Sequence, residues 1–260
     1  MIDAWLDLPI PLMALVATLV FGASALLCNW GMHHSPIAAR IGGYRGVVGP
    51  FFAAISALFA LFLTFLASDV WERKNRAWHV VQTESDALSA LVALAATNET
   101  AANQINDAVR SYITAVIEDE WPRMRQQESS PEAAERVNQL LQSVAAAASS
   151  YAPTVHDKML QKAIDARDAR AQRTSLSINR AETLQWLSVI VLALLTQLSI
   201  AMVHLDRSEP QRMALGVFSV AAVFTICVVA AYDRPFDGHL RISPDPLAEV
   251  LERLPPQKAQ

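Results

Sequence analysis

The chain has little charge and almost no cysteine. Only 18% of its 260 residues are charged, against about 25% in an ordinary soluble domain. Its two cysteines, Cys28 and Cys227, both lie in apolar stretches, which argues against a disulfide scaffold or a zinc site. A net charge of −4 argues against a nucleic-acid partner, whose binding would require neutralised phosphates.

Motifs of enzymes and cofactor sites are missing as well. The sequence has no Gly-rich phosphate loop followed by Lys-Ser/Thr, no HExxH, no CxxC and no GxSxG. We therefore expect no catalytic residues, no cofactor and no metal site, and the protein is not expected to be an enzyme.

Hydrophobic residues, by contrast, make up 53% of the chain and gather in four uncharged stretches. About 20 residues at 1.5 Å rise cross a hydrocarbon layer of roughly 30 Å, so each stretch is long enough to span a membrane. The sequence predicts an all-α, polytopic membrane protein with four transmembrane helices. The stretches are residues 8–30, 47–68, 183–203 and 213–232.

Basic residues orient these spans. Nine lie on the side of both termini and the central segment, and four lie on the other side. The positive-inside rule therefore predicts cytoplasmic N- and C-termini. The nine are Arg73, Lys74, Arg76, Arg167, Arg170, Arg173, Arg180, Arg234 and Arg241, and the four are Arg40, Arg45, Arg207 and Arg212.

The central segment is predicted to be a cytoplasmic helical bundle. Apolar residues at helical spacing continue beyond the second span, so one helix of more than about forty residues is expected. Asn98 or Thr100 caps the next helix, and Ser130-Pro131 begins another. A last helix, starting at Thr154, is expected to run into the third span.

Four regions follow from these patterns. The last of them contains five prolines and cannot be one helix, so it is expected to lie along a partner surface or to end disordered. The regions are 1–68 (first two spans and their loop), 69–182 (cytoplasmic helices), 183–232 (last two spans) and 233–260 (Pro-rich segment).

The second span is rich in phenylalanine, with five in the fifteen residues 51–65. One helical face carries Phe52, Ile55, Phe59, Phe62 and Leu66. This face could contact lipid or pack within a bundle. It could also form a hydrophobic pore neck, because apolar rings gate by dewetting and the positive edges of phenyl rings tolerate anions.

Charged residues near the membrane edge also have more than one interpretation. Asp69, Trp71, Glu72 and Trp78 close the second span, and the two acids are placed for local ion pairs one turn further on. A basic stripe approaches the third span and could contact lipid headgroups, concentrate anions at a vestibule, or be a plain solvated face. The stripe consists of Arg167, Arg170, Arg173 and Arg180.

Two motifs resemble the bacterial bestrophins, which are anion channels. In the second span, Pro50-Phe51 opens the helix, Phe62-Leu63-Thr64-Phe65 follows, and Asp69, Trp71 and Trp78 close it. After the last span, Asp233-Arg234-Pro235-Phe236 is similar to the Pro-Phe-Gly segment of that family.

The resemblance implies a bestrophin-like homo-oligomer, a pentamer, in the bacterial inner membrane. Its second span would line a pore with the neck residues named above, and its partners would be the lipid bilayer, further copies of the chain, and chloride or other small anions. The acidic calcium site of animal bestrophins has no counterpart. The alternative is a non-conducting scaffold or signalling protein that binds partners through its cytoplasmic helices.

Overall fold

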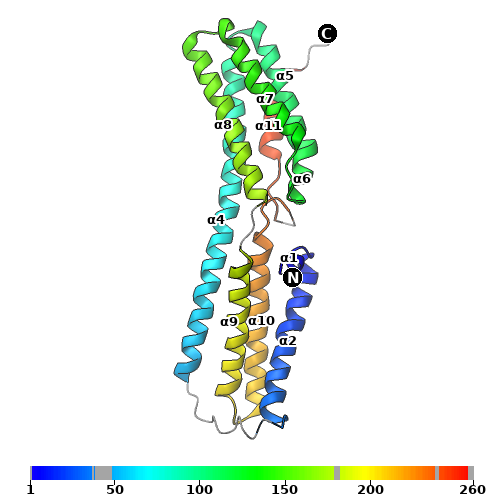
Figure 1. The fold of residues 1–260 in the computed structure, drawn as a ribbon, viewed down its shortest axis with the longest axis vertical. Helices are drawn as coiled ribbons and strands as arrows, with labels where there is room; N and C mark the ends of the chain where they lie inside the picture. Colours follow the sequence, from blue (N-terminus) through cyan, green and yellow to red (C-terminus); the bar gives the residue numbers. More distant parts are fainter. Residues whose placement is uncertain (1, 37, 39–48, 179–181, 238–239, 257–260) are drawn as a thin grey trace. The chain divides into compact units, whose positions relative to one another are not determined.

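The computed structural model describes residues 2–36, 38, 49–178, 182–237 and 240–256. Every regular element in these ranges is a helix, which confirms the all-α prediction (Figure 1). The helices are α1 (Ile2–Leu6), α2 (Ile10–His33), α4 (Gly49–Ala95), α5 (Glu99–Ala115), the π-helical turn η2 (Val116–Glu120), α6 (Trp121–Arg125), α7 (Pro131–Ala146), the 3-10 turn η3 (Ala147–Ser150), α8 (Pro153–Ile178), α9 (Thr183–Val203), α10 (Ser208–Tyr232) and α11 (Asp245–Arg253).

The four predicted membrane spans are confirmed as helices. α2, α9, α10 and the first part of α4 are long and apolar enough to cross a bilayer. α4 continues without a break and reaches 47 residues, as the apolar periodicity predicts. The expected continuation of α8 into α9 falls on residues 179–181, which lie outside the described part of the chain.

The chain divides into two compact units. The membrane unit comprises Met1–Glu72 and Ala181–Asp233, and the polar unit comprises Arg73–Arg180 and Arg234–Gln260. α4 begins in the first unit and ends in the second, so one continuous helix contributes to both.

Buried amides tie the helices of the membrane unit together. Gln197 of α9 donates to the carbonyl of Phe21 (3.1 Å) and to the hydroxyl of Ser219 (2.8 Å), which joins α9 to α2 and α10. Asn29 Nδ2 donates to Gln211 Oε1 at 2.7 Å, which joins α2 to α10. Since lipid chains are as apolar as leucine, such polar contacts and close packing hold membrane helices together.

The helices of the polar unit begin where their capping residues predict. Asn98 Oδ1 accepts from the N–H groups of Thr100 (3.1 Å) and Ala101 (3.4 Å), which confirms Asn98 as the cap of α5. Ser130 Oγ accepts from Ala133 N at 3.0 Å and begins α7. Each side chain satisfies a backbone donor that the first helical turn leaves unpaired.

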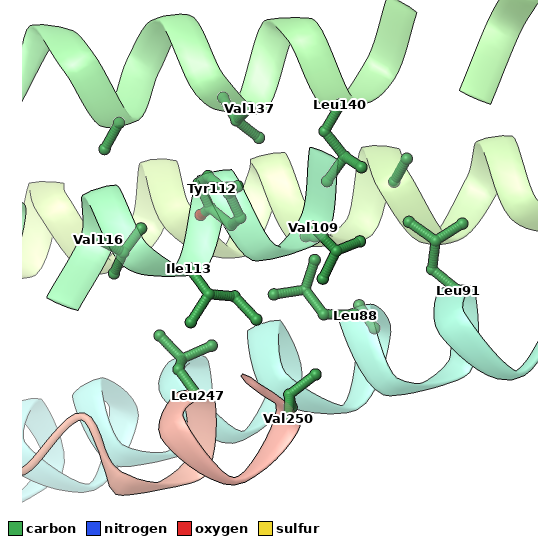
Figure 2. Packing of buried hydrophobic residues seen from close by; sticks show 14 of the residues in the cluster. Leu88, Leu91, Val109, Tyr112, Ile113, Val116, Val137, Leu140, Leu247 and Val250 are labelled. Carbon is green, nitrogen blue, oxygen red and sulfur yellow. The ribbon is translucent and has the colours of Figure 1, made fainter. Parts of the chain in front are cut away.

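The core of the polar unit draws on helices far apart in the sequence. Figure 2 shows α4, α5, α7 and α11 contributing side chains to one cluster. From α11, the buried Leu247 and Val250 point toward Ile113 of α5 and Leu88 of α4. The expectation that residues 233–260 lie along a partner or end disordered is therefore wrong for Phe236–Leu254, because this segment completes the core of its own unit.

Candidate functional site

One side of α4 packs against helices of its own subunit within the membrane unit. Phe52, Phe59 and Leu66 belong to its apolar clusters. Leu66 is only 2% exposed, and the ring of Phe59 meets that of Phe218 on α10 edge-on, with centroids 5.8 Å apart. This side is occupied by packing within the subunit.

A second side of α4 carries bulky apolar side chains that the subunit leaves uncovered. Leu58, Phe62 and Phe65 are 48%, 42% and 61% exposed. At about 100° per residue, the three fall within one sector roughly 60° wide, and Phe51 lies in the same sector two turns earlier. We call Phe51, Leu58, Phe62 and Phe65 the aromatic row.

The aromatic row differs from the neck face predicted from the sequence. Phe62 belongs to both sets. Phe52, Ile55, Phe59 and Leu66 lie toward the side that packs within the subunit, where Leu66 is buried and the other three are half-buried. The prediction is corrected for these four residues, because apolar periodicity identifies apolar faces but not which of them the chain's own helices cover.

Two tryptophans of the membrane-edge motif remain exposed. The ring of Trp71 meets Tyr232 edge-on, with centroids 6.2 Å apart, and still keeps 60% of its surface open. Trp78 is 49% exposed. Asp69 is half-buried and Glu72 is exposed, and their local ion pairs stay a prediction.

A buried network of charges lies in the polar unit. Arg173 of α8 is fully buried, and its Nε and Nη2 donate to the two carboxylate oxygens of Glu84 on α4, at 2.7 and 3.1 Å. Its Nη2 also lies 2.8 Å from Glu120 Oε1 of η2. Arg170 donates to Glu120 Oε2, and Tyr112 OH donates to Glu84 Oε1 at 2.5 Å. Two guanidinium groups thus balance two carboxylates inside the core.

This network corrects the interpretation of the basic stripe. Arg173 and Arg170 neutralise buried carboxylates, so neither is free to contact lipid headgroups or to attract anions to a vestibule. Arg167 is half-exposed and pairs with its neighbour Asp168 at 2.8 Å. Arg180 lies outside the described residues. The stripe failed as a prediction because the opposing acids come from other helices.

Neighbouring groups set two pKa values in this unit. Burial raises the pKa of Tyr112 well above its ordinary value, and the negative charge of Glu84 raises it further. The hydrogen bond that Ser130 donates to Asp119 lowers the pKa of Asp119, and a hydrogen bond from Arg123 lowers it again. The phenol therefore stays protonated in the folded state, while the carboxyl of Asp119 stays ionised.

Trp121 connects the charge network to the segment after the last span. Its ring lies 5.0 Å from the guanidinium carbon of Arg173, a cation–π distance. Phe236 packs edge-on against the same ring, with centroids 5.8 Å apart, and Trp121 Nε1 donates to the carbonyl of Ile242 at 3.4 Å. The segment that follows α10 is thus seated on α6.

The C-terminal motif has a structural role in this seat. Asp233 is buried directly after α10. Arg234 pairs with Asp237 at 2.8 Å, and the carbonyl of Pro235 accepts from Ile242 N at 2.7 Å. These bonds close a turn that presents Phe236 to the core of the polar unit.

Three residues of the network, Glu84, Glu120 and Tyr112, were not predicted. A signal for Glu84 does exist in the sequence, because it stands three residues after Val81 and four before Leu88 on an otherwise apolar helical stripe. Acids on such stripes are rarely buried unless paired, so Glu84 called for a basic partner. The sequence could not name Arg173 as that partner.

Comparison with known proteins gives a family and a fold. A family model described as the bestrophin-like domain matches residues 19–247. A variant of the bacterial bestrophin homolog from Klebsiella pneumoniae is similar with a TM-score of 0.72 and 12% identity, over 92% of this chain and 96% of that chain. A second structure of that homolog gives a TM-score of 0.65 and 13% identity, over 92% and 94%. No curated protein matches the chain.

At these identities the solved structures establish the fold alone, a four-span helical membrane protein in contact with the bilayer. The family model covers most of the sequence, including the aromatic row and the segment after α10. The motifs of the second span and of residues 233–236 lie within that match. The chain therefore belongs to the bestrophin-like family.

Proposed function

We propose that this protein is an ion channel of the bacterial inner membrane, a homo-oligomer of five copies that passes chloride or other small anions. The observation that carries the proposal is the aromatic row, which lies on the membrane-spanning part of α4 and is left uncovered by the subunit. Membership in a family related to anion channels supports it.

The aromatic row suits a pore neck. Copies of α4 around an axis would stack Leu58, Phe62 and Phe65 as successive rings, separated by about 6 and 4.5 Å along the helix. Rings of this kind form a dry constriction that wets when the channel opens. The hydrogen edges of phenyl rings carry the positive part of the quadrupole, which favours an anion over a cation in the neck.

The charge distribution supports cytoplasmic termini and a cytoplasmic polar unit. Nine basic residues of the loops and tails lie on that side and four on the other, the bias that the positive-inside rule associates with the cytoplasm. Ions leaving the neck would then enter the cytoplasm alongside the polar half of α4.

Current recordings test the proposal. In planar bilayers with a chloride gradient, purified wild-type protein should give currents that reverse near the chloride potential. Phe62→Ala should raise the current several-fold, because a smaller ring widens and wets the neck. Phe224→Ala is the matched control, since Phe224 on α10 is 70% exposed and lies outside the row, and its currents should equal those of the wild type.

Two results would contradict the channel. One is silence of the wild type and of Phe62→Ala at every voltage and pH. The other is a monomer by native mass measurement in a membrane mimic, because a single copy has no axis to enclose. Either result would favour the non-conducting scaffold.

A further inference from the structure

A third side of α4 is exposed and differs from the other two. In the membrane it presents the small residues Ala53, Ala57, Ala60 and Thr64, and beyond it the exposed Trp71 and Trp78. At about 100° per residue, these six fall in one sector roughly 60° wide. We call them the contact strip. It lies beside the aromatic row, on the opposite flank from the side that packs against α10.

Lipid does not account for the exposure of Trp78. The uncharged stretch of the second span ends at Ser68. Ten residues of helix place Trp78 about 15 Å further along, whereas the headgroup layer on each side of a bilayer is roughly 5–8 Å thick. Trp78 therefore lies beyond the lipid and leaves half of a large ring open to water.

Such exposure is unusual in the polar unit. Among the residues that the structure describes there, the large apolar side chains that are exposed are Trp78, Ile178 and Leu240, and Trp78 is the largest of them. Exposed tryptophans outside the bilayer are typical of protein interfaces, in which they supply much of the binding energy.

We propose that the contact strip is where a second copy of this chain packs against α4, with Trp71 and Trp78 as its anchors. This inference rests on the proposed channel. If the aromatic row faces the axis of a ring, each flank of that row must meet a neighbouring helix. Phe59 and Phe218 show that one flank meets the subunit's own α10, so the other flank meets the next copy.

The residue types fit a helix rather than lipid. Small side chains let two membrane helices approach closely. An exposed face of α9 has the opposite character, with large aliphatic residues at the same helical spacing. These are Leu184, Leu187, Val191, Leu195 and Leu198.

Photo-crosslinking tests the contact strip. Full-length protein in nanodiscs carries p-benzoylphenylalanine at position 78 or, as control, at position 224, which lies on the exposed side of α10. Light should produce a ladder of covalent multimers from position 78 and none from position 224.

Native mass measurement on the same samples separates the two proposals. If the protein is an oligomer and position 78 gives no chain-to-chain product, the contact strip is overturned while the channel stands. If the protein is a monomer, the channel falls and the contact strip falls with it.

A steric pair gives an independent test within the membrane. Ala57→Phe should lower the assembled fraction roughly tenfold, because a large ring holds the neighbouring helix away. Val220→Phe is the matched control, since Val220 is 72% exposed on α10. It should leave assembly unchanged, and both variants should keep the wild-type helix content. Equal assembly of the two variants would overturn the contact strip.

Discussion

The two units bury polar side chains of different kinds. The polar unit buries the charges of Glu84, Glu120 and Arg173, whereas the spans of the membrane unit bury the neutral amides of Gln197 and Gln211. Next to water, the charges of one unit can be paired and satisfied during folding. In the hydrocarbon layer a charge is far more expensive, so neutral amides join the helices instead.

The difference teaches how each unit selects its helix partners. Arg173 fits only where two carboxylates meet it, so the network specifies how α4, α8 and η2 come together. The amides of the membrane unit mostly bond to backbone carbonyls and other neutral groups, which many positions could supply. Charge therefore contributes strongly to specificity in the polar unit, and close packing contributes more in the membrane unit.

The largest effect is expected from Arg173→Met. Removing this guanidinium leaves Glu84 fully buried without its cation, and breaking one side of a buried pair costs about 3–5 kcal/mol. Thermal unfolding of the purified protein in detergent, followed by tryptophan fluorescence, measures the loss. Adding Glu84→Gln to this variant should recover part of it, because Glu120 keeps Arg170 as its partner.

Arg167→Met is the control for that prediction. Arg167 is half-exposed and pairs with the neighbouring Asp168, so its loss should change stability by less than about 0.5 kcal/mol. If Arg167→Met and Arg173→Met unfold at the same temperature, the buried network does not stabilise the polar unit.

A smaller effect is expected from the protonation of Tyr112. Because its pKa is raised in the folded protein, the contribution of Tyr112 is fully present below the unfolded value of about 10 and declines as the pH rises above it. In that range stability should fall by up to about 1.4 kcal/mol per pH unit.

Tyr112→Phe isolates this contribution, because the ring stays and the titrating hydroxyl is gone. Denaturation curves of wild type and variant should converge as the pH rises from about 9 to about 11. Curves that stay parallel over this range would show that the phenol does not titrate with folding.

The smallest effect is expected from Gln197→Leu. Hydrogen bonds between membrane helices average about 0.6 kcal/mol, since the unfolded chain in a membrane also finds partners. Unfolding by SDS in mixed micelles measures the change. A loss as large as that of Arg173→Met would contradict the contrast between the two units.

Much of the fold could be predicted from local signals. Uncharged stretches of about 20 residues located the four spans, and Asn98 and Ser130 marked helix starts because caps act over three residues. The cluster of prolines near the end was misinterpreted. Pro246 sits in the first turn of α11, where a missing N–H costs nothing, so it begins a helix rather than preventing one.

The candidate site was less predictable than the fold. Periodicity located the phenylalanines of α4 but placed the neck face on Phe59 and Leu66, which the subunit covers itself. The pairing of Arg173 with Glu84 joins residues 89 positions apart. Both depend on which helices become neighbours, and that information is spread over the whole chain.

The place of α11 in the chain sets an order on biosynthesis. The ribosome makes this helix only after all four spans, yet Leu247 and Val250 fill the core between α4 and α5. Until they emerge, the apolar surface of Leu88 and Ile113 has no cover. Maturation of the polar unit must therefore wait for insertion of the last span, and nascent chains stalled before α11 would expose a sticky groove to chaperones and proteases.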